Sequence, residues 1–479
     1  VVGPNPLFLR YIEHVLPSLG ETGVELSTVG GLFGGAVATG QDDRETSRLK
    51  GDHRMTRLLA NAVGDRQRPL RHGLQIPFGR LRLQLAPKAS ADIVAAAKRR
   101  PGTHNARRRY VEALLWRHFY DQYVAAADRA GRAGEPDDLS PEAPSPADLG
   151  RDLRRRPEVA EALDRMWPLL TPQQLLHDLF GARPLIELAG RGLLDVGEQA
   201  RLYRGRAASV EEVDWTEADL ALLDEARALL GPARRRPGAG DDEGTRSYGH
   251  IVADEAQDLL PMQLRMLGRR SLSGSMTIVG DIAQATAPWA PASWQEVLAH
   301  LPTSRGTRSV ELTVNYRTPS EIMDLAERVL EVAAPHMQPP ESVRATGVPP
   351  RIIAAARSLE EEVARVTTEE AAIASGESAS GGSVAVICPP SLLTSVAGAL
   401  TDAQVAFGTV GAGALDDTVT VVPLEAAKGL EFDSVVVVEP SRLVAEAAGG
   451  LRSLYVALTR ATRRLSVVHA EPLPAPLAG

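Results

Sequence analysis

The chain has 479 residues, of which 44% are hydrophobic and 24% charged, and this composition excludes disorder over the whole chain. Its 53 Lys and Arg residues against 61 Asp and Glu residues give a net charge of −8, which argues against nucleic-acid binding over the whole surface but allows a local basic groove. The single cysteine, Cys388, excludes a disulfide framework, and no apolar stretch reaches the roughly 18 residues of a membrane helix. We therefore expect a cytoplasmic protein of about two to four domains.

The first segment, residues 1–74, begins with a strand end and continues into an amphipathic helix. It opens with the sequence VVGPN, without an initiator Met, a charged leader or a signal-like apolar segment. Apolar residues then recur at helical spacing over residues 9–16. We interpret this opening as the interior of a domain whose first strands and helices precede residue 1.

Residues 75–247 have a different pattern, because strand signals disappear and helical spacing dominates, most clearly over residues 110–123. Three of the five tryptophans lie in this region, so it can form a core of its own. Within it, residues 134–150 contain four prolines, five acidic residues and no cation. This composition predicts a mobile acidic loop, and a solvated linker is the simpler interpretation of it.

Residues 248–305 and 306–479 alternate between strands and helices, which predicts an α/β fold with parallel sheets covered on both faces. The strands are short apolar runs, over residues 250–253, 276–279, 383–388, 419–422 and 434–439. In such folds the functional site lies at the carboxyl ends of the strands.

Two of these strands run directly into polar residues. Asp254 and Glu255 follow the first, and such a pair can hold a nucleotide-bound Mg²⁺ and polarise an attacking water. Asp281 and Gln284 follow the second, where an amide can orient water beside a γ-phosphate. The alternative for the first pair is a solvated acidic loop, and a Gly-Asp pair after a strand is common.

Three later segments offer further nucleotide contacts. Tyr316 and Arg317 could stack on a purine and bind a phosphate, or could be a helix-start Tyr and a surface Arg. The run AKGLE places Lys428 and Gly429 before Glu431, whose carboxylate could accept from a ribose hydroxyl. The run YVALTRA is predicted to open a helix and carries Arg460, a candidate arginine finger.

The order and spacing of DEAQD, GDIAQ, NYR, AKGLE and YVALTRA over residues 250–470 resemble the UvrD/Rep family of superfamily 1 helicases. The resemblance implies two RecA-like parallel-sheet domains, the first truncated and interrupted by a mostly helical insertion, and it implies ATP and Mg²⁺. It assigns Mg²⁺ binding to Asp254, water activation to Glu255, γ-phosphate contacts to Gln284, Arg317 and Arg460, adenine stacking to Tyr316 and ribose binding to Glu431. Asp281, Lys428 and Gly429 complete the expected nucleotide site.

The sequence departs from that family in several places. The phosphate-binding loop GxxxxGK[ST] occurs nowhere in the chain, and we expect it upstream of residue 1. Pro423 and Glu425 stand where family translocases carry a Thr and a His that hold single-stranded DNA. The usual base-stacking aromatic after GDxxQ is missing, and only 111 positions separate Arg317 from Lys428, too few for the large accessory domain of UvrD-type helicases.

The chain resembles the HelD-like branch of this superfamily in these departures, in its helical insertion and in its opening sequence, VVGPNPLFLRYIEHVLPSLGE. Members of that branch bind RNA polymerase and use ATP to release it from nucleic acid. The resemblance implies core RNA polymerase as the partner, with nucleic acid contacted weakly or indirectly, and places residues 75–247 in the main channel of the polymerase. We expect the acidic loop, residues 134–150, to take the place of nucleic acid there. The alternatives are a 3′–5′ DNA helicase or translocase and a non-catalytic polymerase-binding module.

Overall fold

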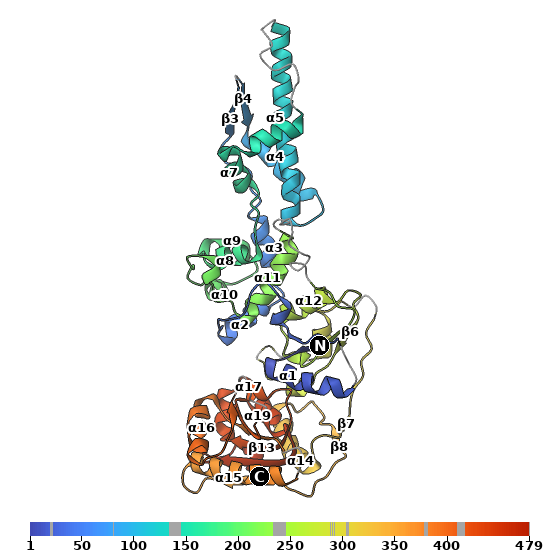
Figure 1. The fold of residues 1–479 in the computed structure, drawn as a ribbon, viewed down its shortest axis with the longest axis vertical. Coiled ribbons are helices and arrows are strands. Elements are labelled where there is room, and N and C mark those ends of the chain that lie inside the picture. Colours follow the sequence, from blue (N-terminus) through green and yellow to red (C-terminus); the bar gives the residue numbers. More distant parts are fainter. Residues whose placement is uncertain are drawn as a thin grey trace. The chain divides into compact units, whose positions relative to one another are not determined.

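In the computed structural model the chain forms two compact units (Figure 1). The first unit comprises residues 1–32 and 246–479, and the second comprises residues 33–245. The described residues are 1–19, 23–79, 81–133, 145–232, 246–287, 289, 291, 293–302, 306–377, 382–409 and 417–478. Residues 134–144 of the predicted acidic loop therefore lie outside the described residues. The prediction of a loop is wrong for residues 146–150, which form the start of helix α6 (Pro146–Arg154), with Leu149 fully buried.

The first unit contains a four-stranded parallel sheet with the strand order β2-β1-β5-β6. Val2 pairs with Ser27 on one side and with Ala253 on the other, so the opening of the chain is a central strand, as its apolar character predicts. The strands are β1 Val2–Gly3, β2 Ser27–Thr28, β5 Ile251–Ala253 and β6 Met276–Ile278. The helices that accompany this sheet are α1 Pro6–Val15, α12 Pro261–Arg270 and α13 Trp294–Leu298.

The same unit contains a six-stranded parallel sheet with the order β11-β12-β10-β13-β14-β9. All four residues of β10 and of β12 are buried, as continuous apolar runs predict for strands covered on both faces. Parallel sheets alternating with helices confirm the predicted α/β fold class. The strands are β9 Arg351–Ala354, β10 Val384–Ile387, β11 Gly408–Thr409, β12 Val419–Val422, β13 Phe432–Val438 and β14 Ala461–His469.

Alternate residues of β13 bury opposite faces of this sheet. Val435 and Val437 belong to one apolar core together with α14 and α19, and Val436 and Val438 belong to another together with α15 and α16. Phe8 of α1 also packs into the first of these cores. The helices are α14 Ser320–Ala333, α15 Leu359–Glu377, α16 Leu393–Asp402, α17 Leu424–Ala427, α18 Pro440–Glu446 and α19 Leu451–Leu458, and a two-stranded parallel ladder joins β7 Val314–Asn315 to β8 Glu341–Ser342.

The helix predicted to continue through YVALTRA ends earlier than expected. Helix α19 stops at Leu458, and β14 begins at Ala461 and pairs with β13. The Thr459 hydroxyl donates to the carbonyl oxygens of Tyr455 and Val456 at the helix end, and β-branched residues follow in the strand. The prediction of helix at residues 459–461 is therefore wrong, and Arg460 lies at a helix-to-strand junction.

The second unit is mostly helical, and it begins at Phe33. The boundary at residue 75 inferred from the sequence stays a prediction. Its helices are α2 Arg44–Gly51, α3 Met55–Gly64, α4 Pro87–Arg99, α5 His104–Ala133, α6 Pro146–Arg154, α7 Pro157–Met166, α8 Pro172–Phe180, α9 Arg183–Gly190, α10 Val196–Leu202 and α11 Glu217–Leu230.

The expectation that strand signals disappear after residue 75 is wrong. Strands β3 Leu74–Phe78 and β4 Leu81–Leu85 form an antiparallel hairpin. Alternate apolar residues of the hairpin, including Ile76 and Leu83, are buried in one core with α4, α5, α6 and α7. The period-two alternation in LQIPF and LRLQL on either side of Gly79 is the sequence signal that predicts this hairpin.

No helix in the described ranges of the chain combines the length and the apolar character that crossing a membrane requires.

Candidate active site

The two acidic residues that follow β5 lie at the carboxyl end of the four-stranded sheet, as predicted. Glu255 has a φ of 51°, in the left-handed region that non-glycine residues rarely occupy. The carboxylate of Asp254 accepts a hydrogen bond from the Glu255 amide at 2.8 Å, which stabilises this turn. Strained backbone of this kind is typical of functional positions, where the surrounding structure holds a side chain in place.

Gln257 connects the ends of β5 and β6. Its side-chain amide donates to the carboxylate of Glu255, and its Oε1 accepts from the backbone amide of Asp281 at 3.1 Å. A Cβ at Gly280 would lie 2.1 Å from that same Oε1, so only glycine leaves room for the Gln257 side chain. Gln257 is fully buried, and it was not among the residues predicted for the site.

Asp281 and Gln284 orient a hydrogen bond between the two sheets. The carboxylate of Asp281 accepts from the Ala283 amide and from the side-chain amide of Gln284, both at 2.9 Å. Because Nε2 of Gln284 is engaged with Asp281, its Oε1 is directed away and accepts from the Arg460 guanidinium at 2.6 Å. A residue that follows β6 is thereby joined to one that precedes β14.

Arg460 is buried, with 5% of its surface exposed. Besides Gln284, its guanidinium donates to the carbonyl oxygens of Val456 at 3.1 Å and Leu430 at 3.4 Å. Burial lowers the pKa of Arg460, and the nearby carboxylates of Glu255 and Glu431 oppose that shift. The result is a positive charge held in a fixed position between carboxylates of both sheets.

The two carboxyl groups beside Arg460 have raised pKa values. Burial raises the pKa of Glu255, and the hydrogen bond from Gln257 and the charge of Arg460 partly offset this effect. Burial also raises the pKa of Glu431, against the opposing charges of Arg317 and Arg460. A carboxylate with a raised pKa is a better general base than an exposed one, so Glu255 is suited to accept a proton from water.

Arg317 and Glu431, predicted to contact a γ-phosphate and a ribose respectively, form an ion pair with each other. Arg317 Nη1 lies 2.7 Å from Glu431 Oε1, and 59% of the Arg317 side chain is exposed. The side chain of Asn315 accepts from the Arg317 amide at 2.9 Å and so fixes the turn after β7. Tyr316 is 73% exposed, so the structure does not bring its ring into this cluster.

Lys428 and Gly429 form a second junction between the two sheets. Lys428 Nζ lies 2.7 Å from Asp258 Oδ2, and both side chains are largely buried. Gly429 has a φ of 73°, and a Cβ there would lie 2.7 Å from Phe8 Cδ2, so both conformation and space require glycine. Asp258 belongs to the DEAQD motif, but no role was predicted for it from the sequence. In the structure it is the acidic partner of Lys428 in this ion pair.

Asp258 also holds the segment after GDIAQ. Its Oδ1 accepts from the amides of Thr286 and Ala287, both at 3.3 Å, and its backbone carbonyl accepts from Trp289 Nε1 at 3.0 Å. Trp289 lies in the segment where the family pattern has a base-stacking aromatic, and its indole is thus bonded within the protein. An ion pair with Lys428 therefore connects the second sheet to this segment.

The site offers oxygen ligands for a hard cation, although no cluster of three or more metal-ligating side chains occurs within the described ranges. Oδ1 of Asp254 accepts a hydrogen bond from the Glu255 amide. Oδ2 of Asp254 has no hydrogen-bond partner among the residues that the structure describes. A single carboxylate suits Mg²⁺, which usually keeps several waters and is shared with the phosphates of its nucleotide. The donor set therefore fits a Mg²⁺ that enters together with a nucleotide.

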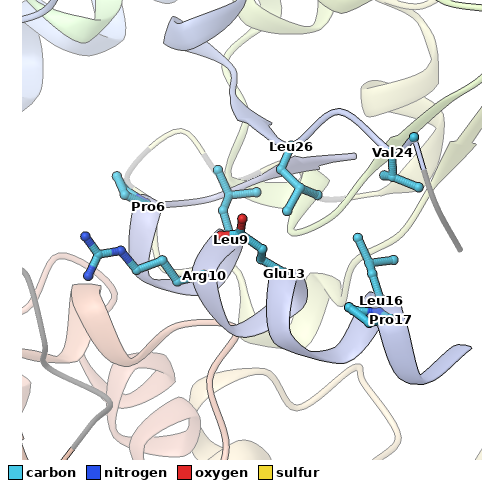
Figure 2. Close-up of a pocket in the computed structure, with 9 residues that line it drawn as sticks. Pro6, Leu9, Arg10, Glu13, Leu16, Pro17, Val24 and Leu26 are labelled. Atoms are coloured by element: carbon cyan, nitrogen blue, oxygen red, sulfur yellow. The ribbon is translucent and has the colours of Figure 1, made fainter. Parts of the chain in front are cut away.

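A cavity of about 540 Å³ lies elsewhere in the first unit, along α1 (Figure 2). Leu9 and Glu13 line it from helix α1 and Leu16 from the 3₁₀ turn that follows, opposite Val24 and Leu26. None of the residues predicted for the site lines this cavity. The polar cluster at the strand ends, rather than this cavity, is therefore the candidate site.

Residues 418–468 match the family model of the UvrD-like helicase C-terminal domain. The matched segment runs from β12 through most of β14 and includes Lys428, Glu431 and Arg460. This part of the chain is therefore similar to a UvrD-like helicase C-terminal domain. None of the curated proteins compared with the chain matches it.

Among solved structures, the chain is similar to the C-terminal domain of a possible DNA helicase from Lactobacillus plantarum WCFS1, with 20% identity and a TM-score of 0.27, over 34% of this chain and 92% of that one. It is also similar to the PRRSV helicase, with 14% identity and a TM-score of 0.24, and to arterivirus nonstructural protein 10, a helicase in complex with DNA, with 15% identity and a TM-score of 0.22. These two matches cover 46% and 47% of this chain and only 34% and 40% of the viral proteins. These structural likenesses are weak, and the similarity to a UvrD-like helicase domain covers residues 418–468.

Proposed function

We propose that the chain is part of a helicase-type ATPase of superfamily 1, with its hydrolytic site at the polar cluster described above. The hydrogen bond between Gln284 and Arg460, beside Glu255, carries this proposal. This bond joins the two sheets through a buried guanidinium. A γ-phosphate bound between Gln284 and Arg460 would contact both sheets at once, so the approach of the sheets would depend on its presence. The match of residues 418–468 to a UvrD-like helicase domain supports the same class.

Each residue then has a stated task. Asp254 would hold the Mg²⁺ of the nucleotide, which when bound stabilises charge on the phosphates. Glu255 accepts the proton of the attacking water, and Gln284, Arg317 and Arg460 bind the γ-phosphate. A phosphate-binding loop that this sequence does not contain would complete the site.

Nucleotide binding requires Arg317 and Glu431 to separate. Their ion pair is partly exposed, so its loss costs little when a phosphate replaces Glu431 as the partner of Arg317. Glu431 is then available for the ribose, Tyr316 for the adenine ring, and Asp281, Lys428 and Gly429 keep the adjoining backbone in place. In this proposal the pair between Arg317 and Glu431 is a resting arrangement of the site.

We further infer that the ATPase acts on RNA polymerase, in the manner of HelD-like factors, rather than by tracking along DNA. Pro423 and Glu425 support this inference. Pro423 precedes the short helix α17, and Glu425 is exposed on that helix, so a carboxylate faces solvent where translocases hold a phosphate. Proline offers no amide donor and glutamate repels phosphate, so this surface is unsuited to single-stranded DNA.

The acidic loop remains part of the proposal. Carboxylates within residues 134–150 would compete with nucleic-acid phosphates for the basic, Mg²⁺-holding channel of the polymerase. Deleting residues 134–144, which leaves helix α6 and the buried Leu149 in place, should weaken displacement of nucleic acid and leave ATP hydrolysis by the full-length protein unchanged. Unchanged displacement would contradict this role for the loop.

The experiment that tests the function measures ATP hydrolysis by the full-length protein alone, with core RNA polymerase, and with single-stranded DNA, at one fixed salt concentration. Stimulation by polymerase and not by DNA is the expected result. Stimulation by DNA alone would favour a 3′–5′ helicase or translocase. If the Glu255→Gln protein kept every polymerase-dependent activity, the chain would instead be a non-catalytic polymerase-binding module.

A further inference from the structure

The positive charge of the protein is concentrated in one part of the second unit. Residues 66–133 contain 15 Lys and Arg residues and 4 Asp and Glu residues, a net charge of +11, whereas the whole chain carries −8. This stretch includes the β3–β4 hairpin, α4 and α5. Such separation of charge within one chain is typical of a surface that binds a polyanion.

Some of these cations are used inside the fold. Arg108 is buried and forms ion pairs with Glu112 and Asp164, and Arg66 lies 3.2 Å from the carboxylate of Asp178. Other cations of this stretch form no ion pair among the residues that the structure describes. Six of them surround the connection between α4 and α5, and none of the six has an ion pair within the part of the chain that the structure describes: Arg68, Lys98, Arg99, Arg100, Arg107 and Arg109. We call these six residues the basic corner.

The basic corner is compact because the connection is short. Helix α4 ends at Arg99 and α5 begins at His104, so the cations at the end of one helix meet those in the first turns of the next. Arg100 lies over the ring of Tyr110, with its guanidinium carbon 4.5 Å from the ring centroid. Gln67 lies 3.1 Å from Nδ1 of the His104 ring and so brings its neighbour Arg68 to the same end of α5.

The backbone beneath the basic corner is held firmly. The indole of Trp167 donates to the carbonyl oxygen of His104 at 2.8 Å, and the two rings are stacked 5.2 Å apart. The Asn105 side chain donates to the carbonyl oxygens of Leu170 and Gly231, both at 2.9 Å. The six cations therefore extend from a preorganised support, which reduces the entropy lost when they bind a ligand.

Two further features favour a negatively charged ligand. The amino end of the 30-residue helix α5 adds the positive end of its dipole to the corner. Arg107 has its Nε buried without a hydrogen-bond partner in the structure. A ligand oxygen that accepted from this Nε would satisfy a donor that the protein leaves unpaired.

We propose that the basic corner binds the phosphate backbone of a nucleic acid. Residues 93–111, which carry five of its six cations, contain no Asp or Glu, and this matches a uniformly charged polymer better than a protein surface of mixed charge. Guanidinium groups also bind phosphate oxygens in a bidentate geometry. This inference does not rest on the ATP site, and it adds a nucleic-acid contact outside the α17 surface, which carries Pro423 and Glu425.

The test measures binding of the full chain to a short fluorescent DNA duplex by anisotropy, without nucleotide, over about 50 to 200 mM salt. The double variant Arg99→Ala with Arg109→Ala removes two exposed cations of the corner. Each lost phosphate contact should reduce the slope of log K against log salt by about 0.9, and the affinity at 0.1 M salt by about eightfold. We therefore expect a slope smaller by about 1.8 for the double variant.

The matched control is Arg151→Ala with Arg165→Ala, which makes the same change in net charge on the same unit. These arginines are exposed and already paired with Asp148 and Glu161. The control should bind DNA as the unchanged chain does, and so should the chain carrying Glu255→Gln, which separates this inference from the proposed ATPase.

Three results would overturn the proposal. The first is an absence of binding by the unchanged chain at the lowest salt concentration. The second is an equal loss of affinity in the corner variant and in the control. The third is competition by polyglutamate as effective as that by unlabelled DNA of equal charge, which would make the corner a site for an acidic peptide.

Discussion

The hydrogen bond between Gln284 and Arg460 gives the sharpest prediction about the site. Replacing Arg460 with alanine removes a buried cation that neutralises Glu255 and Glu431, together with its hydrogen bonds to the carbonyl oxygens of Val456 and Leu430. Breaking a buried charge cluster in this way costs about 3–5 kcal/mol. The bond to Gln284, at 2.6 Å, is one contribution to that cost, and bonds to charged groups contribute about 1.5–3 kcal/mol.

A double-mutant cycle isolates that contribution. We would compare the unchanged chain, Gln284→Ala, Arg460→Ala and the double variant by hydrogen exchange and mass spectrometry of peptides covering residues 276–287 and 451–460. The sum of the two single effects should exceed the effect of the double variant by about 1.5–3 kcal/mol in the free energy of local opening. Peptides from α5, in the other unit, serve as an internal control and should exchange at unchanged rates.

Additive effects would refute this reasoning. If the coupling energy fell below about 0.5 kcal/mol, the two residues would contribute independently, and the two sheets would not be joined at this point. Exchange that accelerated equally in α5 would show a general loss of stability instead of a local opening.

Other features of the site lead to further predictions. Gly429→Ala should lower the free energy of unfolding, measured by urea titration, by about 1–2 kcal/mol or more, because φ is positive there and the new Cβ would overlap the Phe8 ring. The control Gly398→Ala places its Cβ in open space on helix α16 and should raise the free energy of unfolding by up to about 1 kcal/mol in the same titration. Gln257→Ala removes a hydrogen bond that lowers the pKa of Glu255, so the acid limb of the pH–rate profile of ATP hydrolysis should move to higher pH; an unmoved limb would show that another group titrates. Lys428→Met leaves a largely buried carboxylate unpaired and should cost about 1.5–3 kcal/mol in local opening measured by exchange, whereas Lys428→Arg should restore most of it.

The pKa of Glu255 also sets how the stability of the protein depends on pH. Its folded-state pKa lies above the ordinary value of 4.5, so the folded state binds more protons than the unfolded state in that range. The contribution of this group to stability is therefore fully present below about pH 4.5 and decreases as the pH rises towards the folded-state value. Glu255→Gln should remove this dependence.

The α/β fold could be predicted from the sequence because its strands are continuous apolar runs. Residues 384–387 and 419–422 are buried on both faces, and burial of that kind leaves a strong pattern in the residue types. The hairpin of β3 and β4 is harder to predict, because only alternate residues are buried there and the period-two pattern extends over just two short strands beside long helical segments. The end of α19 was missed because a helix and a buried strand share apolar composition where they meet.

The candidate site was predictable in part. The order of the motifs indicated that Glu255, Gln284 and Arg460 act together, and the structure brings them together. Pairing between Arg317 and Glu431 was not predictable, because it depends on the distance between the turn after β7 and the start of β13. Asp258 was missed for a similar reason, since its partner Lys428 lies 170 residues away in the sequence.

The central claim is that the carboxylates after β5 and the arginines of the second sheet form a site for ATP hydrolysis. The most direct test compares single-turnover ATP hydrolysis by the full-length protein and by its Glu255→Gln variant, with ATP affinity measured in parallel. We predict that hydrolysis falls by about 10²–10⁴-fold while the dissociation constant for ATP changes little, because Glu255 acts on water and not on the nucleotide. Hydrolysis at an unchanged rate in the variant would contradict the account.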